Sequence, residues 1–218
     1  MTDVSPYSLV IETRVHLGNN TISDGHFDPV IERNSPIPIS RVKRYFPIQN
    51  NQKHVNIQIY QGEARLVRDN IHLGQLDIRL PVAPKEEAGI DVRFTYDANG
   101  ILQVEATVLK TGQTSTLLIQ DNPGMLSDDE IAQRLAALAE LKIHPRDRLE
   151  IRTLLARGER LYQQLRGEQR EWLGQQISLF ERMVETQDNR VIEPNQKAFA
   201  RMLDELESDS YLNPGSNT

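Results

Sequence analysis

The side chains of this sequence that could bind a metal or transfer a proton are its histidines and carboxylates. One polar segment holds two histidines and two aspartates, a composition similar to the donor set of a metal site. These residues are His16, Asp24, His26 and Asp28. No two of the five histidines have the i, i+4 spacing that places two ligands on one helical face, and no second cluster completes a coordination shell. The sequence therefore favours a solvated polar loop over a metal site.

Other catalytic motifs are missing from the sequence as well. It has no cysteine, which excludes a thiolate nucleophile and a disulfide framework and fits a reducing cytoplasm. It has no P-loop, no G-x-S-x-G and no G-x-G-x-x-G motif. The 31 carboxylates lie mostly on predicted polar faces, where a solvated surface explains them better than acid–base chemistry. We therefore predict that this chain is not an enzyme.

The net charge of −6 and the pI of about 5.4 argue against a general nucleic-acid binder and against binding to an anionic membrane. No apolar run approaches the length of a membrane span, and the first residues lack the basic and apolar regions of a signal peptide. We expect a soluble, cytoplasmic protein.

The first 122 residues alternate apolar and polar side chains with the period of β-strands. Many short strands at near-regular spacing predict a β-sandwich. The expected strands are 8–13, 42–49, 54–61, 74–80, 90–96, 101–108 and 115–120. The segment 15–38 is expected to be a long polar loop, in which 30–33 form an edge strand ended by Pro36 and Pro38.

The clearest pattern is a β-hairpin at residues 94–106. Alternation runs up to Tyr96, stops at Asp97-Ala98-Asn99-Gly100, and resumes at Leu102. Glycine accepts the positive φ that a tight turn requires, so the two halves are expected to pair. The hairpin carries no candidate catalytic residue.

From about Leu126 the apolar period becomes helical. Ser127 and Glu130 have the spacing of a capping box, which predicts a helix start. Pro145 is expected to break this pattern or to begin the next helix. Further apolar stripes follow at Ile151, Leu154, Leu155, Leu161, Tyr162 and Leu165, at Leu173, Ile177, Phe180 and Val184, and at Phe199, Met202, Leu203 and Leu206. Trp172 is expected to be an anchor of this bundle rather than a platform for a ligand.

Strands first and helices afterwards predict a segregated mixed α and β fold. We expect an N-terminal antiparallel β-sandwich over residues 1–122, a C-terminal helical bundle over 123–210, and a flexible tail over 211–218.

Six motifs occur in a fixed order along the first 131 residues. They are DVSPYSLVIET (3–13), IPIS (37–40), NNQKHVNIQIYQGE (50–63), DNIHLGQLDI (69–78), VRFTYDANGILQVEA (92–106) and LSDDEI (126–131). In this order they resemble the substrate-binding region of DnaK-type chaperones, the seventy-kilodalton heat-shock family; together they are specific, although each alone is weak. The helical remainder resembles the family's lid only in pattern and position, and residues 157–188 are nearer to the short, divergent HscC-like bacterial members.

The resemblance implies that the sandwich holds an extended peptide and that the helices close over it as a lid. It implies an apolar peptide-binding pocket lined by Ile11, Phe46, Val55, Ile57 and Ile90. It also implies that main-chain groups of Glu12, Arg14, Phe46 and Ile48 hydrogen-bond the peptide backbone. The bridge over the peptide would be formed by Arg14 and Gln49, or else by Val15 and Ile48. The alternative for each apolar residue is a place in the sandwich core.

The resemblance therefore implies the substrate-binding domain of a chaperone of the stress response, which binds hydrophobic segments of unfolded proteins. It implies no cofactor in this chain: ATP and Mg²⁺ would bind an N-terminal ATPase domain of the intact protein, on which a J-domain co-chaperone would act. One alternative is a helical oligomerisation or scaffolding module, in which Ile177, Phe180 and Phe199 contact another copy. Another is a carbohydrate-active β-sandwich enzyme, which would need a carboxylate pair in a cleft.

Overall fold

The chain divides into two units, Met1–Lys142 and Ile143–Thr218. The computed structural model describes residues 3–17, 21–120 and 127–212, with the main chain alone for 14–17, 21–24, 140 and 209–212. The first α-helix, α1 (Asp128–Ala137), belongs with the strands, so the division falls later than the expected boundary between residues 122 and 123. The expected tail begins within α4 (Asn189–Leu212) and otherwise lies outside the described residues.

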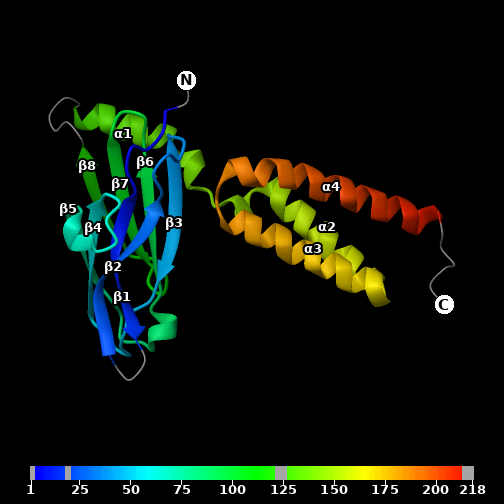
Figure 1. Cartoon of the computed structure of the whole chain (residues 1–218), viewed down its shortest axis with the longest axis horizontal. Helices are drawn as coiled ribbons and strands as arrows, with labels where there is room; N and C mark the ends of the chain where they lie inside the picture. Colours follow the sequence, from blue (N-terminus) through cyan, green and yellow to red (C-terminus); the bar gives the residue numbers. More distant parts are fainter. Residues whose placement is uncertain (1–2, 18–20, 121–126, 213–218) are drawn as a thin grey trace. The chain divides into compact units, whose positions relative to one another are not determined.

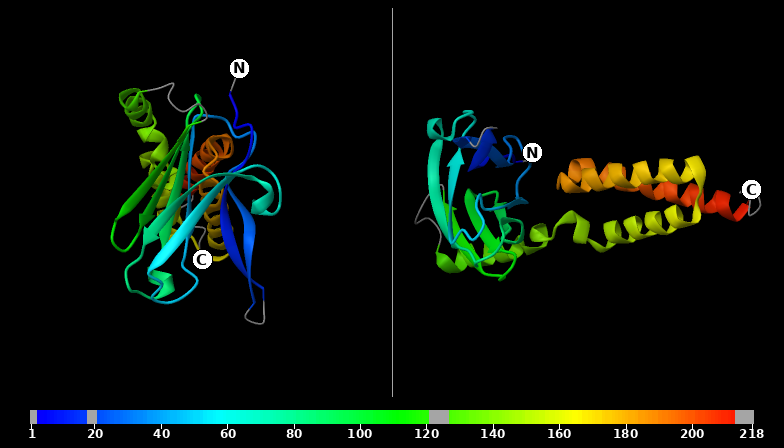
Figure 2. Two further views of the ribbon diagram at one scale, coloured as in Figure 1. Left: turned by 90° about the vertical axis from the view of Figure 1, so that its left-hand side faces the viewer. Right: turned by 90° about the horizontal axis from the view of Figure 1, so that it is seen from below.

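Within the described residues, eight strands of the first unit form two antiparallel sheets (Figures 1 and 2). The strands are β1 (Leu9–Leu17), β2 (Thr21–Ile31), β3 (Ile39–Tyr45), β4 (His54–Gln61), β5 (Ile71–Arg79), β6 (Ile90–Tyr96), β7 (Ile101–Val108) and β8 (Thr114–Gln120). One sheet has the order β2-β1-β4-β5 and the other β3-β6-β7-β8. The predicted antiparallel sandwich followed by helices is therefore confirmed.

Strand β2 occupies the segment that the sequence predicts to be a polar loop. It pairs with β1 from Leu17↔Thr21 to Leu9↔Ile31 and forms one edge of its sheet. The predicted edge strand at 30–33 is only its end, and β2 stops at Ile31. Periodicity missed the strand because an edge strand with many polar side chains lacks the apolar alternation of a half-buried one.

The apolar faces of the two sheets meet in one core. Ile59 of β4, Val92 and Phe94 of β6, and Val104 of β7 are completely buried there. Burying one such side chain contributes about 1.5–3 kcal/mol relative to leaving it in water. The period of two in the sequence thus identifies the core correctly.

The edge strands β5 and β8 close against each other along one side of the sandwich. Gly74 of β5 lies under the side chain of Leu117 of β8, and a Cβ at Gly74 would stand 2.9 Å from Leu117 Cδ2. The absence of a side chain at Gly74 therefore lets the two edges approach.

The hairpin at residues 94–106 is confirmed. Tyr96 pairs with Leu102 beside the turn, and Gly100 has a φ of 80°, in the left-handed region that glycine tolerates. The Asp97 carboxylate is buried and accepts hydrogen bonds from the N–H groups of Asn99 and Ile101, each at 2.8 Å. The hairpin is therefore a structural element: β6 and β7 are the two central strands of their sheet.

Helix α1 begins as its capping box predicts. The Ser127 side chain accepts from the Glu130 N–H, and the Glu130 carboxylate accepts from the Ser127 N–H at 2.9 Å. The hydrogen bonds from Ser127 lower the pKa of Glu130. The cap thus stabilises the helix and the charged form of Glu130 together.

Helix α1 and the turn after it attach to the sandwich. Ile131 is buried, and the Arg134 guanidinium lies 3.8 Å from the Asp97 carboxylate in the hairpin turn. Lys142 Nζ lies 2.8 Å from the Glu105 carboxylate of β7. These contacts explain why α1, with its single buried apolar residue, groups with the strands.

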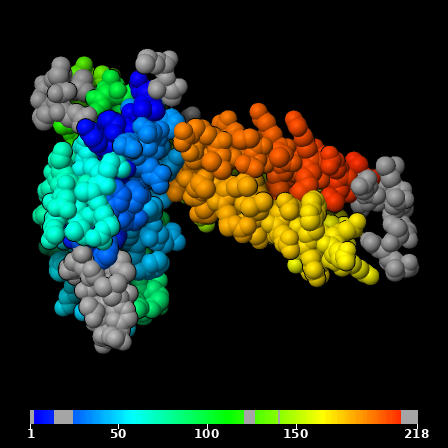
Figure 3. Space-filling model, viewed as in Figure 1, coloured from blue at the N-terminus to red at the C-terminus, as the bar shows by residue number. Residues whose placement is uncertain are grey.

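The second unit packs α2 (Leu149–Gln164), α3 (Gly167–Glu185) and α4 around its own core, and Figure 3 shows the surfaces of α3 and α4 in contact. Pro145 begins a 3₁₀ turn, Pro145–Asp147, just before α2. The rings of Phe180 and Phe199 stack with centroids 4.6 Å apart at the α3–α4 contact. None of the described helices is long and apolar enough to cross a membrane.

This packing corrects two expectations for the helices. Ile177, Phe180 and Phe199 are only 4%, 2% and 6% exposed, so they cannot contact another copy as the oligomerisation alternative requires. Trp172, expected to anchor the bundle, is 44% exposed and lines a surface groove with Leu179 instead of lying in the helical core.

We expect Asp97→Ala to lower the free energy of unfolding of the sandwich by about 1–3 kcal/mol, because two N–H groups of the turn lose their acceptor. Urea unfolding monitored by circular dichroism measures this change. Glu86→Ala is the matched control, because Glu86 is exposed and its ion-pair partner Lys85 Nζ lies 4.0 Å away. The control should change stability by about 0.5 kcal/mol or less. Equal effects of the two variants would contradict the role of Asp97.

Candidate functional site

The first sheet opens where β1 leaves β4. Within the described residues, β1 pairs with β4 only over residues 9–11, whereas β4 pairs with β5 from His54 to Gln61. In the part of the chain that the structure describes, β1 continues to Leu17 paired with β2 alone. Because the main-chain groups of a strand point alternately to its two edges, every second residue from Glu12 onward directs them to an edge without a neighbouring strand.

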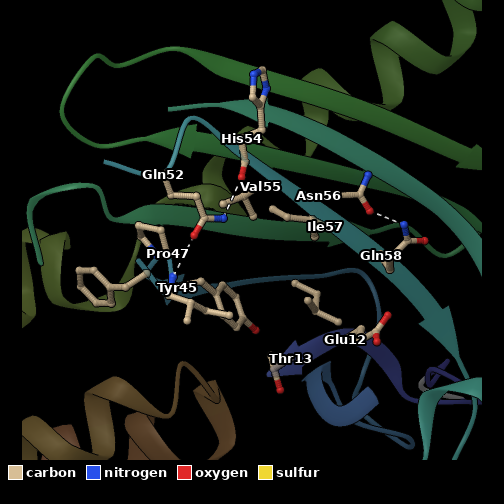
Figure 4. Close-up of a pocket in the computed structure, with 13 residues that line it drawn as sticks. Glu12, Thr13, Tyr45, Pro47, Gln52, His54, Val55, Asn56, Ile57 and Gln58 are labelled. Carbon is tan, nitrogen blue, oxygen red and sulfur yellow. Dashed lines mark hydrogen bonds between the residues drawn. The ribbon is translucent and has the colours of Figure 1, made fainter. Parts of the chain in front are cut away.

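A pocket of about 480 Å³ lies at this opening (Figure 4). Its walls come from β1 at residues 11–13, from the end of β3 and the following loop at 45–48 and 52, and from β4 at 54–58. Figure 4 shows Val55 and Ile57 reaching the pocket from β4, with Tyr45 and Thr13 on its other side. The volume is in the range of ligand pockets, about 300–1,000 Å³.

The apolar part of the pocket combines buried and exposed side chains. Ile11 and Ile57 are 3% and 5% exposed, and Val55 is half-buried. Val55 and Ile57 share one face of β4 because alternate residues of a strand point the same way. Phe46, at the end of the β3 wall, is 53% exposed. Phe46 therefore has the most apolar surface to bury against a bound molecule.

Gln52 holds the loop that forms the second wall. Its Oε1 accepts from the N–H group of Ile48 at 3.1 Å, and its Nε2 donates to the His54 carbonyl oxygen at 2.8 Å (Figure 4). The same Oε1 accepts from the Gln49 N–H at 3.4 Å. Strand β3 ends at Tyr45, before the predicted end at 49, because Pro47 has no N–H to continue a ladder. One side chain thus replaces the strand pairing that the loop lacks.

Polar side chains continue from the pocket across the outer face of β4 and β5. Gln58 Nε2 donates to Gln75 Oε1 at 2.9 Å, and His72 Nε2 lies 2.7 Å from Gln58 Oε1. The Tyr60 hydroxyl donates to the Glu12 carboxylate at 3.4 Å, and burial together with Glu12 raises the pKa of Tyr60. The pocket therefore has an apolar interior and a polar margin whose side chains are held by one another.

The structure brings together most of the site residues expected from the sequence. Those that line the pocket are Ile11, Glu12, Phe46, Ile48, Val55 and Ile57. Ile90 does not: it is 1% exposed in the sandwich core, where it pairs with Tyr45. Gln49 is exposed and outside the pocket lining, and the side chain of Arg14 lies outside the described residues. The bridge of Arg14 and Gln49, or of Val15 and Ile48, stays a prediction.

Sequence reasoning missed several residues that line the pocket, among them Tyr45 and Gln52. Both carry polar groups that act through a specific partner, which periodicity does not reveal. The only signal for Tyr45 is its position directly before Phe46 at the expected loop, and Gln52 gives no signal beyond lying in a polar turn.

The described residues contain no group of three or more His, Asp and Glu side chains that could hold a metal. His26 and Asp28 lie on β2, where the Asp28 carboxylate bonds Lys43 and Tyr45. The side chains of His16 and Asp24 lie outside the described residues.

Comparison with known proteins agrees with this architecture. A family model described as "Hsp70 protein" matches residues 1–211. The "Heat shock 70 kDa protein" of Trichophyton rubrum is 36% identical over 143 residues, which cover 65% of this chain and 20% of that protein. The "Chaperone protein DnaK" of Mycoplasmoides gallisepticum is 39% identical over 141 residues, 64% of this chain and 22% of the relative. The "Heat shock 70 kDa protein" of Penicillium citrinum is 35% identical over 143 residues, which cover 65% of this chain and 27% of that protein.

A β-sandwich followed by a separate helical unit, with these relatives, is the architecture of a chaperone region. The chain belongs to the Hsp70 family. It spans between 20% and 27% of the length of the three relatives.

We expect Gln52→Ala to loosen the pocket wall without unfolding the sandwich. Loss of a hydrogen bond worth about 1 kcal/mol should speed hydrogen exchange at the Ile48 amide about fivefold. Exchange followed by NMR or mass spectrometry measures it. Gln113→Ala, in the turn between β7 and β8, should leave the Ile48 amide unchanged. An unaltered Ile48 amide in Gln52→Ala would mean that Gln52 does not hold the loop.

Proposed function

We propose that this chain is the peptide-binding region of an Hsp70-type chaperone and holds extended, hydrophobic segments of unfolded proteins in the pocket between β1 and β4. The observation that carries the proposal is the parting of these strands after Ile11, which opens an apolar pocket beside a strand edge. Family membership supports the same conclusion.

The apolar interior supplies the first part of the binding energy. A Leu or Ile side chain of a client that enters the pocket covers Ile11, Val55 and Ile57 and part of Phe46. Complete burial of such a side chain contributes about 1.5–3 kcal/mol. This contribution depends on an aliphatic or similar side chain but not on its neighbours, which suits a protein with many clients.

Main-chain hydrogen bonds supply the second part. The edge of β1 from Glu12 onward faces the pocket, so an extended peptide can pair with Glu12 or Arg14 as an added strand would. Such bonds do not depend on the client's sequence. At Ile48 the N–H already bonds Gln52, so this residue offers a peptide its carbonyl oxygen rather than its N–H.

The helical unit is proposed to act as the lid over the bound peptide, and the pattern of residues 157–188 supports a relationship with the HscC-like members. For the intact protein we propose a cytoplasmic location and a J-domain co-chaperone. We also propose that ATP and Mg²⁺ bind a region of the intact protein outside these residues. No step of peptide binding in this proposal passes through a nucleotide.

We expect Phe46→Ala to weaken binding of a fluorescent, Leu-centred extended peptide about tenfold to a hundredfold, because a large apolar contact is lost. Fluorescence anisotropy measures the affinity. Ile71→Ala is the matched control: Ile71 is 65% exposed on β5 and outside the pocket lining, so its loss should change the affinity less than about twofold. Equal affinities for Phe46→Ala and the wild type would refute a peptide site here.

Ile57→Asp should abolish peptide binding, because it places an unpaired carboxylate in the apolar interior. Circular dichroism must accompany the measurement to separate loss of the site from loss of the fold. A folded Ile57→Asp variant with wild-type affinity would place the peptide elsewhere.

A further inference from the structure

Three polar side chains join the two sheets beside the pocket. Lys43 Nζ donates to Asp28 Oδ1 at 2.8 Å, and the Tyr45 hydroxyl donates to Asp28 Oδ2 at 2.6 Å. Lys43 Nζ also donates to the Pro29 carbonyl oxygen at 2.6 Å. Asp28 lies on β2, the edge of one sheet, whereas Lys43 and Tyr45 lie on β3, the edge of the other, and Figure 1 shows these strands as neighbours. We call Asp28, Lys43 and Tyr45 the inter-sheet clasp.

The clasp connects two walls of the pocket. Asp28 is the cross-strand partner of Ile11, which lies in the β1 wall. Tyr45 directly precedes Phe46 in the loop wall, and its own side chain lines the pocket (Figure 4). The hydrogen bond from Tyr45 to Asp28 therefore fixes how far the loop wall stands from the β1 wall.

The contact is strong enough to hold the walls and exposed enough to open. A phenol that donates to a carboxylate at this distance makes a charge-assisted hydrogen bond, the stronger class of hydrogen bond in proteins. Burial and Asp28 both raise the pKa of Tyr45, so its hydroxyl remains a donor. The side chains of Asp28 and Lys43 are 29% and 40% exposed, so water can replace their bonds when the clasp opens.

We propose that the inter-sheet clasp sets the width of the pocket and thereby the size of the client side chain that it accepts, with Tyr45 as a positioning residue. The inference rests on the peptide-binding function proposed above. With the clasp closed, the pocket binds an aliphatic side chain more tightly than a large aromatic one. With the clasp broken, the loop wall moves outward, a larger side chain enters, and an aliphatic client is released sooner.

Tyr45→Phe tests this inference, because it removes the hydroxyl and keeps the ring. Two fluorescent peptides that differ only in a central Leu or Trp report the selectivity. We expect the preference for Leu over Trp to fall about tenfold, and the Leu peptide to dissociate about tenfold faster, as befits the loss of one hydrogen bond to a charged group. An unchanged Leu-to-Trp ratio, even with both affinities lowered equally, would reduce Tyr45 to a structural role and overturn the inference.

Three variants control the test. Asp28→Asn keeps an acceptor for Tyr45 and should retain more of the selectivity than Asp28→Ala, which should behave like Tyr45→Phe. Arg44→Gln, on the same strand, breaks the Arg44–Asp91 pair at 2.7 Å outside the pocket lining and should leave the ratio unchanged. A ratio that falls equally in Arg44→Gln would assign the effect to general loosening of β3 and contradict the clasp.

A measurement without peptide separates failure of the clasp from failure of the proposed function. In the free chain, hydrogen exchange at the Ile48 amide, which donates to Gln52 in the same loop wall, should be about tenfold faster in Tyr45→Phe than in the wild type. Unchanged exchange would overturn the clasp. If the wild-type chain binds neither peptide, the proposed function and the proposed role of the clasp fail together. If the chain binds the peptides but Tyr45→Phe leaves the Leu-to-Trp ratio unchanged, only the role of the clasp in size selection is overturned.

Discussion

The parting of β1 from β4 after residue 11 is the constraint on which the candidate site depends. A sheet is stable because neighbouring strands hydrogen-bond each other's main-chain N–H and C=O groups. A gap inside a sheet leaves some of these groups without a partner strand. Here β2 pairs with β1 on its other edge as far as Leu17, so the strand is retained after it leaves β4. The groups left over face an open pocket, where water can bond them at little cost. The opening is thus compatible with a stable sandwich.

Apolar and polar contacts have different tasks in the two units. The sandwich core and the helical core are made by close-packed aliphatic and aromatic side chains, such as the Phe180–Phe199 stack. Polar pairs add further connections at the surface: Arg157 of α2 bonds Asp204 and Glu207 of α4 at 2.7 Å and 2.8 Å. The loop wall of the pocket is likewise held by hydrogen bonds to Gln52 and Asp28. Structures built in this way keep a fixed core while their surface contacts can exchange with water.

The sequence was enough to predict the sandwich and the hairpin, because strands buried on one face alternate apolar and polar residues. It also predicted the start of α1, because a capping box has a fixed residue spacing. It was not enough for β2, whose polar residues show no buried face. Nor could it tell that Ile90 belongs to the core while Ile57 reaches the pocket, since both positions are apolar and alternate alike. Tyr45 and Gln52 act through hydrogen bonds to partners that only the folded chain brings near. Residues defined by a partner, rather than by a pattern, need the structure.

The close approach of β5 and β8 over Gly74 has a consequence for how the protein behaves at high concentration. Strand β8, TSTLLIQ, has no charged residue and no proline, the usual devices that stop an edge strand from pairing with another molecule. Its neighbour β5 and the side chain of Leu117 stand in for them. A bulky residue at position 74 that pushed Leu117 away would expose the uncharged edge of β8 to pairing with another molecule. Aggregation would then begin at β8 and not at the opening beside β1.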